Sequence, residues 1–320
     1  MAPSSRDSPE GLPLQLSHAA YRRARGFLLE RARPLERALF LRDYEDGSGS
    51  AVIDALAAFR NRDGGFGHGL EPDLRLPSSS VLATNHALRM LHEIGAPPDH
   101  PFVSGGIAWL LGAYEPALGT WRSVPPEAEQ HPHADHWKWA LHADGGPWPR
   151  AVLPRAEILA QLHRWECCVP ARFLADLDRR FLADLAGLDA SIGADAIAAC
   201  EALVQTQAAP ARLREATAQR VRELGGAMVS RDPAAWSGYV AKPLKLAPRP
   251  GSTLAASLAA EVSRNLDWEI EQQAADGSWL PNWSWGAYPE AWQQARLEWQ
   301  GDLTLQALRA LRAWGRIEPP

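Results

Sequence analysis

Apolar residues recur at helical spacing through most of the chain, and no segment shows a convincing strand-like alternation of apolar and polar residues. Val52, Leu56 and Phe59 fall at i, i+4 and i+7, which predicts an amphipathic helix. Residues 171–188 and 194–207 are further helical stretches. The pattern therefore predicts an all-α protein.

The two ends of the chain carry similar segments. Residues 84–95 (TNHALRMLHEIG) and 304–315 (TLQALRALRAWG) are identical at six of twelve positions, and each ends in a glycine, where a helix C-terminus favours a left-handed residue. Upstream, residues 52–66 align with 265–279, and both segments end in an Asp-Gly turn. Each unit is predicted to be helix, turn, loop and helix, with a loop seven residues longer in the second unit. Asp302 is predicted to be the N-cap of the last helix.

Helical hairpins repeated at roughly 50 residues imply five or six hairpins, with a weaker copy starting at residues 139–149. The first and last units resemble each other most and neither has a polar capping face, which favours a closed ring over an open superhelix. Residues 1–15 are rich in Pro, Ser and Gly, and we predict that they form a flexible tail. Residues 16–320 are predicted to form one domain, an α/α toroid closing a central cavity, with the repeats near 52–95 and 265–315.

Residues 273–279 (QAADGSW) resemble the QW motif of triterpene cyclases such as squalene–hopene cyclase. Residues 60–66 (RNRDGGF) are similar to the Asp-Gly-Gly-Phe turn in the β subunits of protein prenyltransferases. The two copies and their flanking helices cover about a third of the chain. The resemblance implies an α/α toroid with inner and outer rings of helices and an aromatic-lined cavity. It also assigns four motif residues to the scaffold: Asp63, Gln273, Asp276 and Trp279.

The chain departs from these families in its catalytic motifs. It lacks the D-x-D-D motif that initiates class II terpene cyclisation, the D-D-x-x-D diphosphate-binding motif and the Asp-x-Cys zinc pattern of protein prenyltransferases. The resemblance therefore supports the fold more strongly than the activity.

The loop after the first turn, residues 67–80, carries His68, Glu71 and Asp73 between glycines and prolines. A carboxylic acid desolvated there by aromatic walls would have a raised pKa and could donate a proton. The alternative is that Glu71 and Asp73 cap a helix or pair with Arg75. We take His68, Glu71 and Asp73 as candidate catalytic residues.

The segment HPHADHWKW, residues 131–139, contains several metal-ligand types, but its spacing matches no zinc signature, and we predict neither a metal nor an organic cofactor. Asp135 is a fourth candidate catalytic residue, because it could line the cavity, or act with Glu71 as the acid and base of a catalytic pair. A solvated loop is the simpler interpretation of this segment.

Residues 272–299 contain five tryptophans. A buried aromatic side chain removes about 150–250 Å² from water, so this run must pack on something. Aromatic faces also stabilise cations, by about 0.5–2 kcal/mol each. We predict that the run is both a pocket wall and a plug at one end of the ring. The predicted substrate-binding residues are Trp137, Trp283, Trp285, Tyr288 and Trp292.

The composition of the chain limits the classes of partner that we expect. The net charge of −5 gives no basic footprint, so we expect no nucleic acid. Three cysteines, two of them adjacent, do not form a disulfide framework and fit a cytoplasmic protein. No signal peptide is evident and no apolar run approaches the ~20 residues of a membrane span. An Arg-rich helix over residues 21–41 leaves peripheral membrane contact open.

The function predicted from the sequence is that of a terpene-cyclase-like enzyme, a lyase or isomerase. It would act on an apolar isoprenoid by acid-initiated carbocation chemistry in the aromatic-lined cavity. One alternative is a non-catalytic small-molecule-binding toroid, whose cavity carboxylates would all bond to scaffold groups. Another is a carbohydrate-active α/α-barrel hydrolase or lyase that uses Glu71 and Asp135 as acid and base. The sequence does not identify the substrate or the oligomeric state.

Overall fold

The structure is a computed structural model that describes residues 13–143 and 152–319. Within these ranges it contains α-helices and short 3₁₀ turns and no β-strand, only isolated bridges, which confirms the all-α prediction. Residues 1–12 of the predicted tail and residues 144–149 of the weaker third repeat lie outside the described residues. The α-helices are α1 His18–Glu30, α2 Pro34–Tyr44, α3 Gly49–Leu56, α4 Val81–Glu93, α5 Pro101–Gly112, α6 Trp139–His142, α7 Arg155–Arg164, α8 Ala171–Leu185, α9 Gly193–Val204, α10 Ala211–Met228, α11 Pro243–Leu246, α12 Ala259–Glu271 and α13 Pro289–Ala313.

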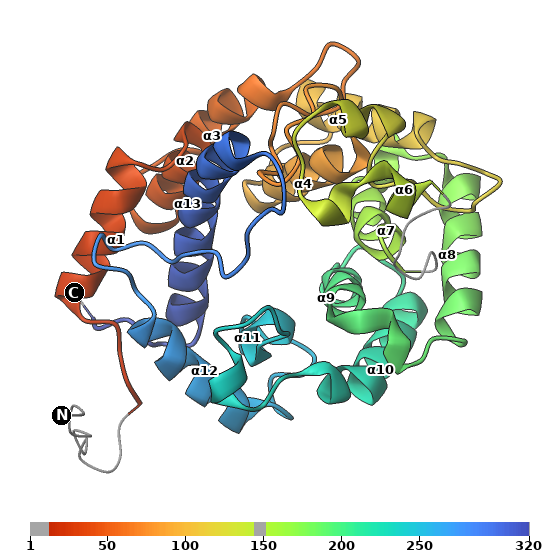
Figure 1. The fold of residues 1–320 in the computed structure, drawn as a ribbon. Helices are drawn as coiled ribbons and strands as arrows, with labels where there is room; N and C mark the ends of the chain where they lie inside the picture. The colour runs from red at the N-terminus through yellow and green to blue at the C-terminus, as the bar shows by residue number, and fades with distance from the viewer. Residues whose placement is uncertain (1–12, 144–151, 320) are drawn as a thin grey trace.

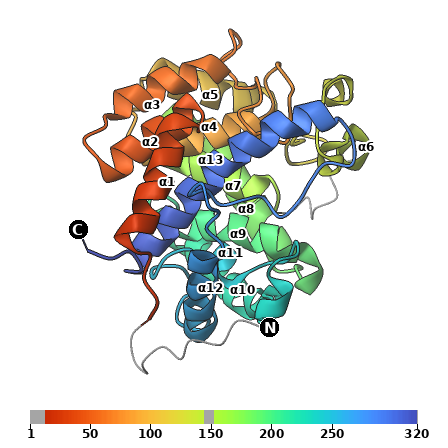
Figure 2. The ribbon, with the colours of Figure 1, turned by 60° about the vertical axis from the view of Figure 1, so that its left-hand side comes forward.

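The helices follow one another in chain order around the molecule, and the last helix returns to the side of the first (Figure 1). Helices adjacent in sequence pack as pairs, notably α4 with α5, α7 with α8 and α9 with α10. A second set of contacts joins α4, α7, α9 and α11 in succession. At the end of the chain α13 packs against both α1 and α2, and the turned view shows the same neighbours (Figure 2). The two ends of the chain thus share one interface.

The helix ends follow local sequence chemistry, with one exception to our predictions. Ser80 accepts a hydrogen bond from the Ala83 amide at 3.1 Å and so caps α4. Gly315, just after α13, has φ +66°, as predicted for a helix C-terminus. The prediction that Asp302 caps the last helix is wrong, because Asp302 lies inside α13. That helix begins at Pro289, whose fixed φ suits a first turn.

The two repeat units have the same geometry. The Phe66 amide donates to Thr84 Oγ1 at 3.0 Å, and the Trp279 amide donates to Thr304 Oγ1 at 3.0 Å. In both turns the aspartate accepts a hydrogen bond from the amide two residues later, at 3.0 and 3.1 Å, and the next glycine has φ +93°. The repeat predicted from the sequence is therefore a repeat of structure.

The turn of the second unit joins the two ends of the chain. Gln273 Nε2 donates to the carbonyl of Ala20 in α1 at 2.9 Å, and Asp276 forms a salt bridge with Arg31 at 2.8 Å. Gly277 lies so close to α1 that an added Cβ would sit 2.3 Å from its backbone. Only glycine fits there, because its φ is positive as well. Three of the four motif residues assigned to the scaffold, Gln273, Asp276 and Trp279, therefore contribute to this junction or its turn.

Candidate functional site

The loop that carries the predicted acids is held by backbone pairing. Residues 67–80 run back along residues 131–134, with hydrogen bonds of 2.9 Å at Asp73 and at Arg75. Gly67 permits a close crossing of the loop, because a Cβ there would lie 2.2 Å from a backbone carbonyl of the returning segment. The pairing brings the segment that contains Asp73 against the His-rich segment.

Asp73 is the centre of a hydrogen-bonded cluster that we call the indole cage: Asp73, Trp283, Trp285 and Trp299. Trp285 and Trp299 each donate an indole N–H to Asp73 Oδ1 at 2.7 Å. Trp283 donates its indole N–H to Oδ2 at 3.2 Å. His136 Nε2 lies 3.8 Å from Oδ2. Asp73 is only 2% exposed, so these donors replace the water that a carboxylate would otherwise bind.

Glu71, two residues earlier, has a different environment, with no hydrogen-bond donor bonded to its carboxyl group in the described part of the chain. Its exposed fraction is 9%. Burial raises the pKa of Glu71 to about 8, with further contributions from the charges of Asp73 and Asp302. The imidazole Nδ1 of His86 lies 3.7 Å from the Glu71 carboxyl. Burial, with the charge of Arg89, lowers the pKa of His86 to about 3. At neutral pH this contact therefore joins a protonated carboxyl and a neutral imidazole rather than an ion pair.

The other two candidate catalytic residues have partners of their own. His68 Nε2 lies 2.9 Å from Asn61 Oδ1, so the ring ties the loop to the first Asp-Gly turn. Asp135 is exposed and forms a salt bridge with Lys138 at 2.8 Å, which lowers the pKa of its carboxyl. Neither side chain shares the buried environment of Glu71.

The predicted substrate-binding aromatics divide into two groups. Trp137, Trp285 and Trp292 pack with aliphatic residues of the loop and of α13 in a small apolar cluster separate from the main core. Tyr288 is 41% exposed, and its ring centroid lies 5.8 Å from that of His133. This group packs on the loop and on α13, and its predicted role as a plug stays a prediction.

Trp283 belongs with Trp299 instead. The two half-buried rings meet edge to face, with centroids 5.1 Å apart, and both donate to Asp73. The exposed Tyr239 reaches over Trp283 from the loop after α10, with ring centroids 6.2 Å apart. The indole rings beside Asp73 are therefore fixed by their N–H edges, while aromatic side chains surround them.

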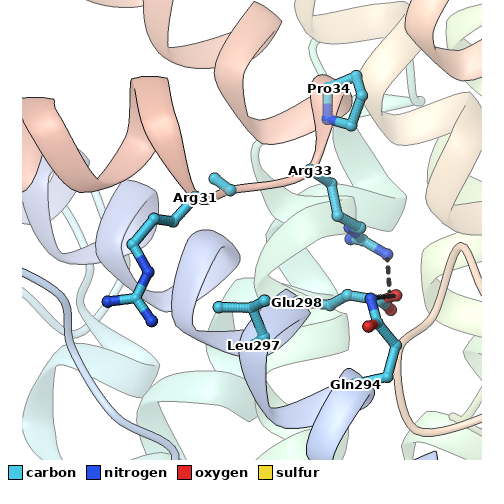
Figure 3. Close-up of a pocket in the computed structure, with 7 residues that line it drawn as sticks. Arg31, Arg33, Pro34, Gln294, Leu297 and Glu298 are labelled. Carbon is cyan, nitrogen blue, oxygen red and sulfur yellow. Dashed lines mark hydrogen bonds and ion pairs between the residues drawn. The ribbon is translucent and has the colours of Figure 1, made fainter.

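One alternative proposed that Arg75 pairs with Glu71 or Asp73. The structure does not show this pairing. The Arg75 guanidinium binds Glu298 of α13, with contacts of 2.5 and 3.2 Å. Arg33 also reaches Glu298, at 3.5 Å, and binds the fully buried Glu36 through two hydrogen bonds. Figure 3 shows Arg33 and Gln294 directed at Glu298. These charges compensate one another and connect the loop to α2 and α13.

The structure adds two residues that were not singled out from the sequence, Trp299 and His86. Trp299 belongs to the Trp-rich run. His136, one of the metal-ligand types in the His-rich segment, lies beside Asp73 instead of in a metal site among the described residues. His86 gave no signal, because it occupies an ordinary position in a helical pattern.

Two further findings bear on the predicted partners. Across residues 13–143 and 152–319, no three His, Cys, Asp or Glu side chains are grouped so as to hold a metal ion. None of the helices in the described part of the chain combines the length and the apolar character needed to cross a bilayer. No protein-family model and no curated protein matches the sequence.

Proposed function

We propose that the chain is a terpene-cyclase-like enzyme built on an α/α toroid, in which Glu71 donates a proton to an alkene of an apolar isoprenoid substrate. The packing of α13 against α1 and α2, together with the succession of helices in Figure 1, supports the ring. The proposed cavity is bordered by the indole cage and by the loop that carries Glu71.

One observation carries this proposal: two carboxyl groups on a single loop have opposite environments. Asp73 is surrounded by hydrogen-bond donors, whereas Glu71 is 9% exposed and its carboxyl accepts no hydrogen bond in the described part of the chain. Burial, with the neighbouring charge of Asp73 as a smaller contribution, raises the pKa of Glu71 to about 8, which makes it an acid at neutral pH. Enzymes that use general acids separate paired groups in this way.

The proposed chemistry follows from these states. The Glu71 O–H bond breaks, a C–H bond forms on the substrate alkene, and a carbocation and a carboxylate result. Asp73 and the faces of Trp283 and Trp299 would stabilise the cation. Indoles that donate their N–H to a carboxylate become more electron-rich, because linked hydrogen bonds polarise one another. Loss of a proton from the cyclised cation to the Glu71 carboxylate restores the acid.

A non-catalytic binding toroid is the second candidate. It is favoured by Asp73 and Glu298, whose carboxylates are bonded to scaffold groups, as that alternative expects. Glu71 does not fit it, because its carboxyl lacks such bonds among the described residues. The carbohydrate-active alternative is less well supported, since Asp135 is exposed and paired with Lys138.

The test is product analysis by gas chromatography and mass spectrometry after incubation with squalene and with prenyl diphosphates. We expect cyclised products from the wild type and from Asp135→Asn, and none from Glu71→Gln. Binding of these substrates without conversion would support the second candidate. Full activity in Glu71→Gln would exclude Glu71 as the acid.

A further inference from the structure

A groove runs along α13 beside the connection from α1 to α2. It encloses ≈ 450 Å³ between α13 and the connection from α1 to α2. It shares Arg31 and Leu297 with the adjoining pocket of ≈ 200 Å³, shown in Figure 3. Nothing in the proposed chemistry uses this groove.

Three lining residues form a stripe along the helix. Trp292, Arg296 and Gln300 are spaced at i, i+4 and i+8, so they share one face of α13 over about 12 Å. The Trp292 ring contacts the Trp285 ring, with ring centroids 5.8 Å apart. Leu297 adds apolar surface beside the stripe. The groove therefore presents an aromatic end, a guanidinium and an amide in that order.

The two polar members of the stripe have unused hydrogen-bonding capacity. Gln300 is 7% exposed, yet its side-chain amide bonds to no group in the described part of the protein. Arg296 is exposed and forms no ion pair with any described residue. By contrast, Arg31 across the groove is paired with Asp276. The amide atoms of Gln300 are not among the buried polar atoms that lack a partner, so they reach the solvent in the groove and can bond to a ligand there.

We propose that this groove binds a small organic carboxylate with a flat apolar part. The apolar part lies on Trp292 and Leu297, the carboxylate binds the Arg296 guanidinium, and the Gln300 amide donates to it. A guanidinium and an amide N–H match the two oxygens of a carboxylate. This inference is independent of the proposed function, because Glu71 and Asp73 take no part in it.

The test uses 2-naphthoate as the probe and 2-naphthamide as its uncharged counterpart, with binding measured by isothermal titration calorimetry on the full chain. Arg296→Gln removes the cation. Arg264→Gln is the matched control, because Arg264 is an exposed arginine of α12 that does not line the groove. Circular dichroism establishes that each variant is folded.

We expect 2-naphthoate to bind the wild type and the Arg264 variant equally, and the Arg296 variant about tenfold more weakly. The amide should bind at least about tenfold more weakly than the carboxylate. Absence of naphthoate binding to the folded wild type would overturn the proposal. Equal binding of acid and amide, or equal losses in the two arginine variants, would overturn it as well.

Discussion

Replacing Asp73 by asparagine tests whether the indole cage depends on a charged acceptor. The asparagine side chain keeps one oxygen for Trp285 and Trp299 but turns an NH₂ group towards the N–H of Trp283. Hydrogen bonds to a charged group contribute about 1.5–3 kcal/mol and neutral ones about 0.5–1.5 kcal/mol. Two bonds weakened by about 1 kcal/mol each, and the loss of the third at about 2 kcal/mol, sum to about 4 kcal/mol.

Two effects reduce that sum. The variant no longer buries a carboxylate, and water can reach the half-buried Trp283. We therefore expect Asp73→Asn to lower the free energy of unfolding by about 2 kcal/mol, and Asp73→Ala, which removes both acceptor oxygens and all three hydrogen bonds, by about 4 kcal/mol. The assay is equilibrium unfolding in urea, with near-ultraviolet circular dichroism reporting on the tryptophans. Asp135→Asn, which changes an exposed carboxylate, should leave the urea midpoint unchanged. Wild-type stability together with a wild-type spectrum in the Asp73→Asn variant would refute the reasoning.

Three other changes follow from the structure. Between pH 4.5 and about 8 the folded chain holds a proton on Glu71 that the unfolded chain releases, so the free energy of unfolding should fall by up to about 1.4 kcal/mol per pH unit, and Glu71→Gln should remove that slope in urea titrations. Thr84→Val and Thr304→Val each leave a buried amide without its acceptor, and thermal unfolding should show similar losses of about 1–3 kcal/mol. Gly277→Ala should lower the melting temperature sharply because its Cβ meets the α1 backbone, whereas Gly251→Ala, with nothing within 4 Å, should not.

The parts of the fold that depend on short-range chemistry could be predicted from the sequence. The helices, the Asp-Gly turns and the repeat are specified by residues a few positions apart, such as Asp63 and its turn glycine. The alignment of the two repeats also pairs Thr84 with Thr304. It does not show that each threonine hydroxyl accepts a hydrogen bond from an amide in the preceding turn. The error at Asp302 arose because a plausible cap residue is also compatible with a helix interior, and an earlier proline supplied the true start.

The contacts that define the candidate site could not be predicted from short-range sequence patterns. The three indole donors of Asp73 are 210, 212 and 226 residues away in the sequence, so no local pattern pairs them with it. The sequence indicated a Trp-rich run and an acidic loop separately. Their meeting depends on α13 returning to the N-terminal helices, and that geometry is a property of the whole chain.

The difference between Glu71 and Asp73 shows what the fold adds to the sequence. Both are acids on one Pro-containing loop, and both were candidates for the same role. The direction of each side chain decides between them: Asp73 meets the N–H edges of three indoles, while Glu71 meets His86 and little water. A carboxylate with donors is stable as an anion, and a buried carboxyl without them is stable with its proton. Burial of Glu71, more than the neighbouring charge of Asp73, therefore keeps the proton on this carboxyl.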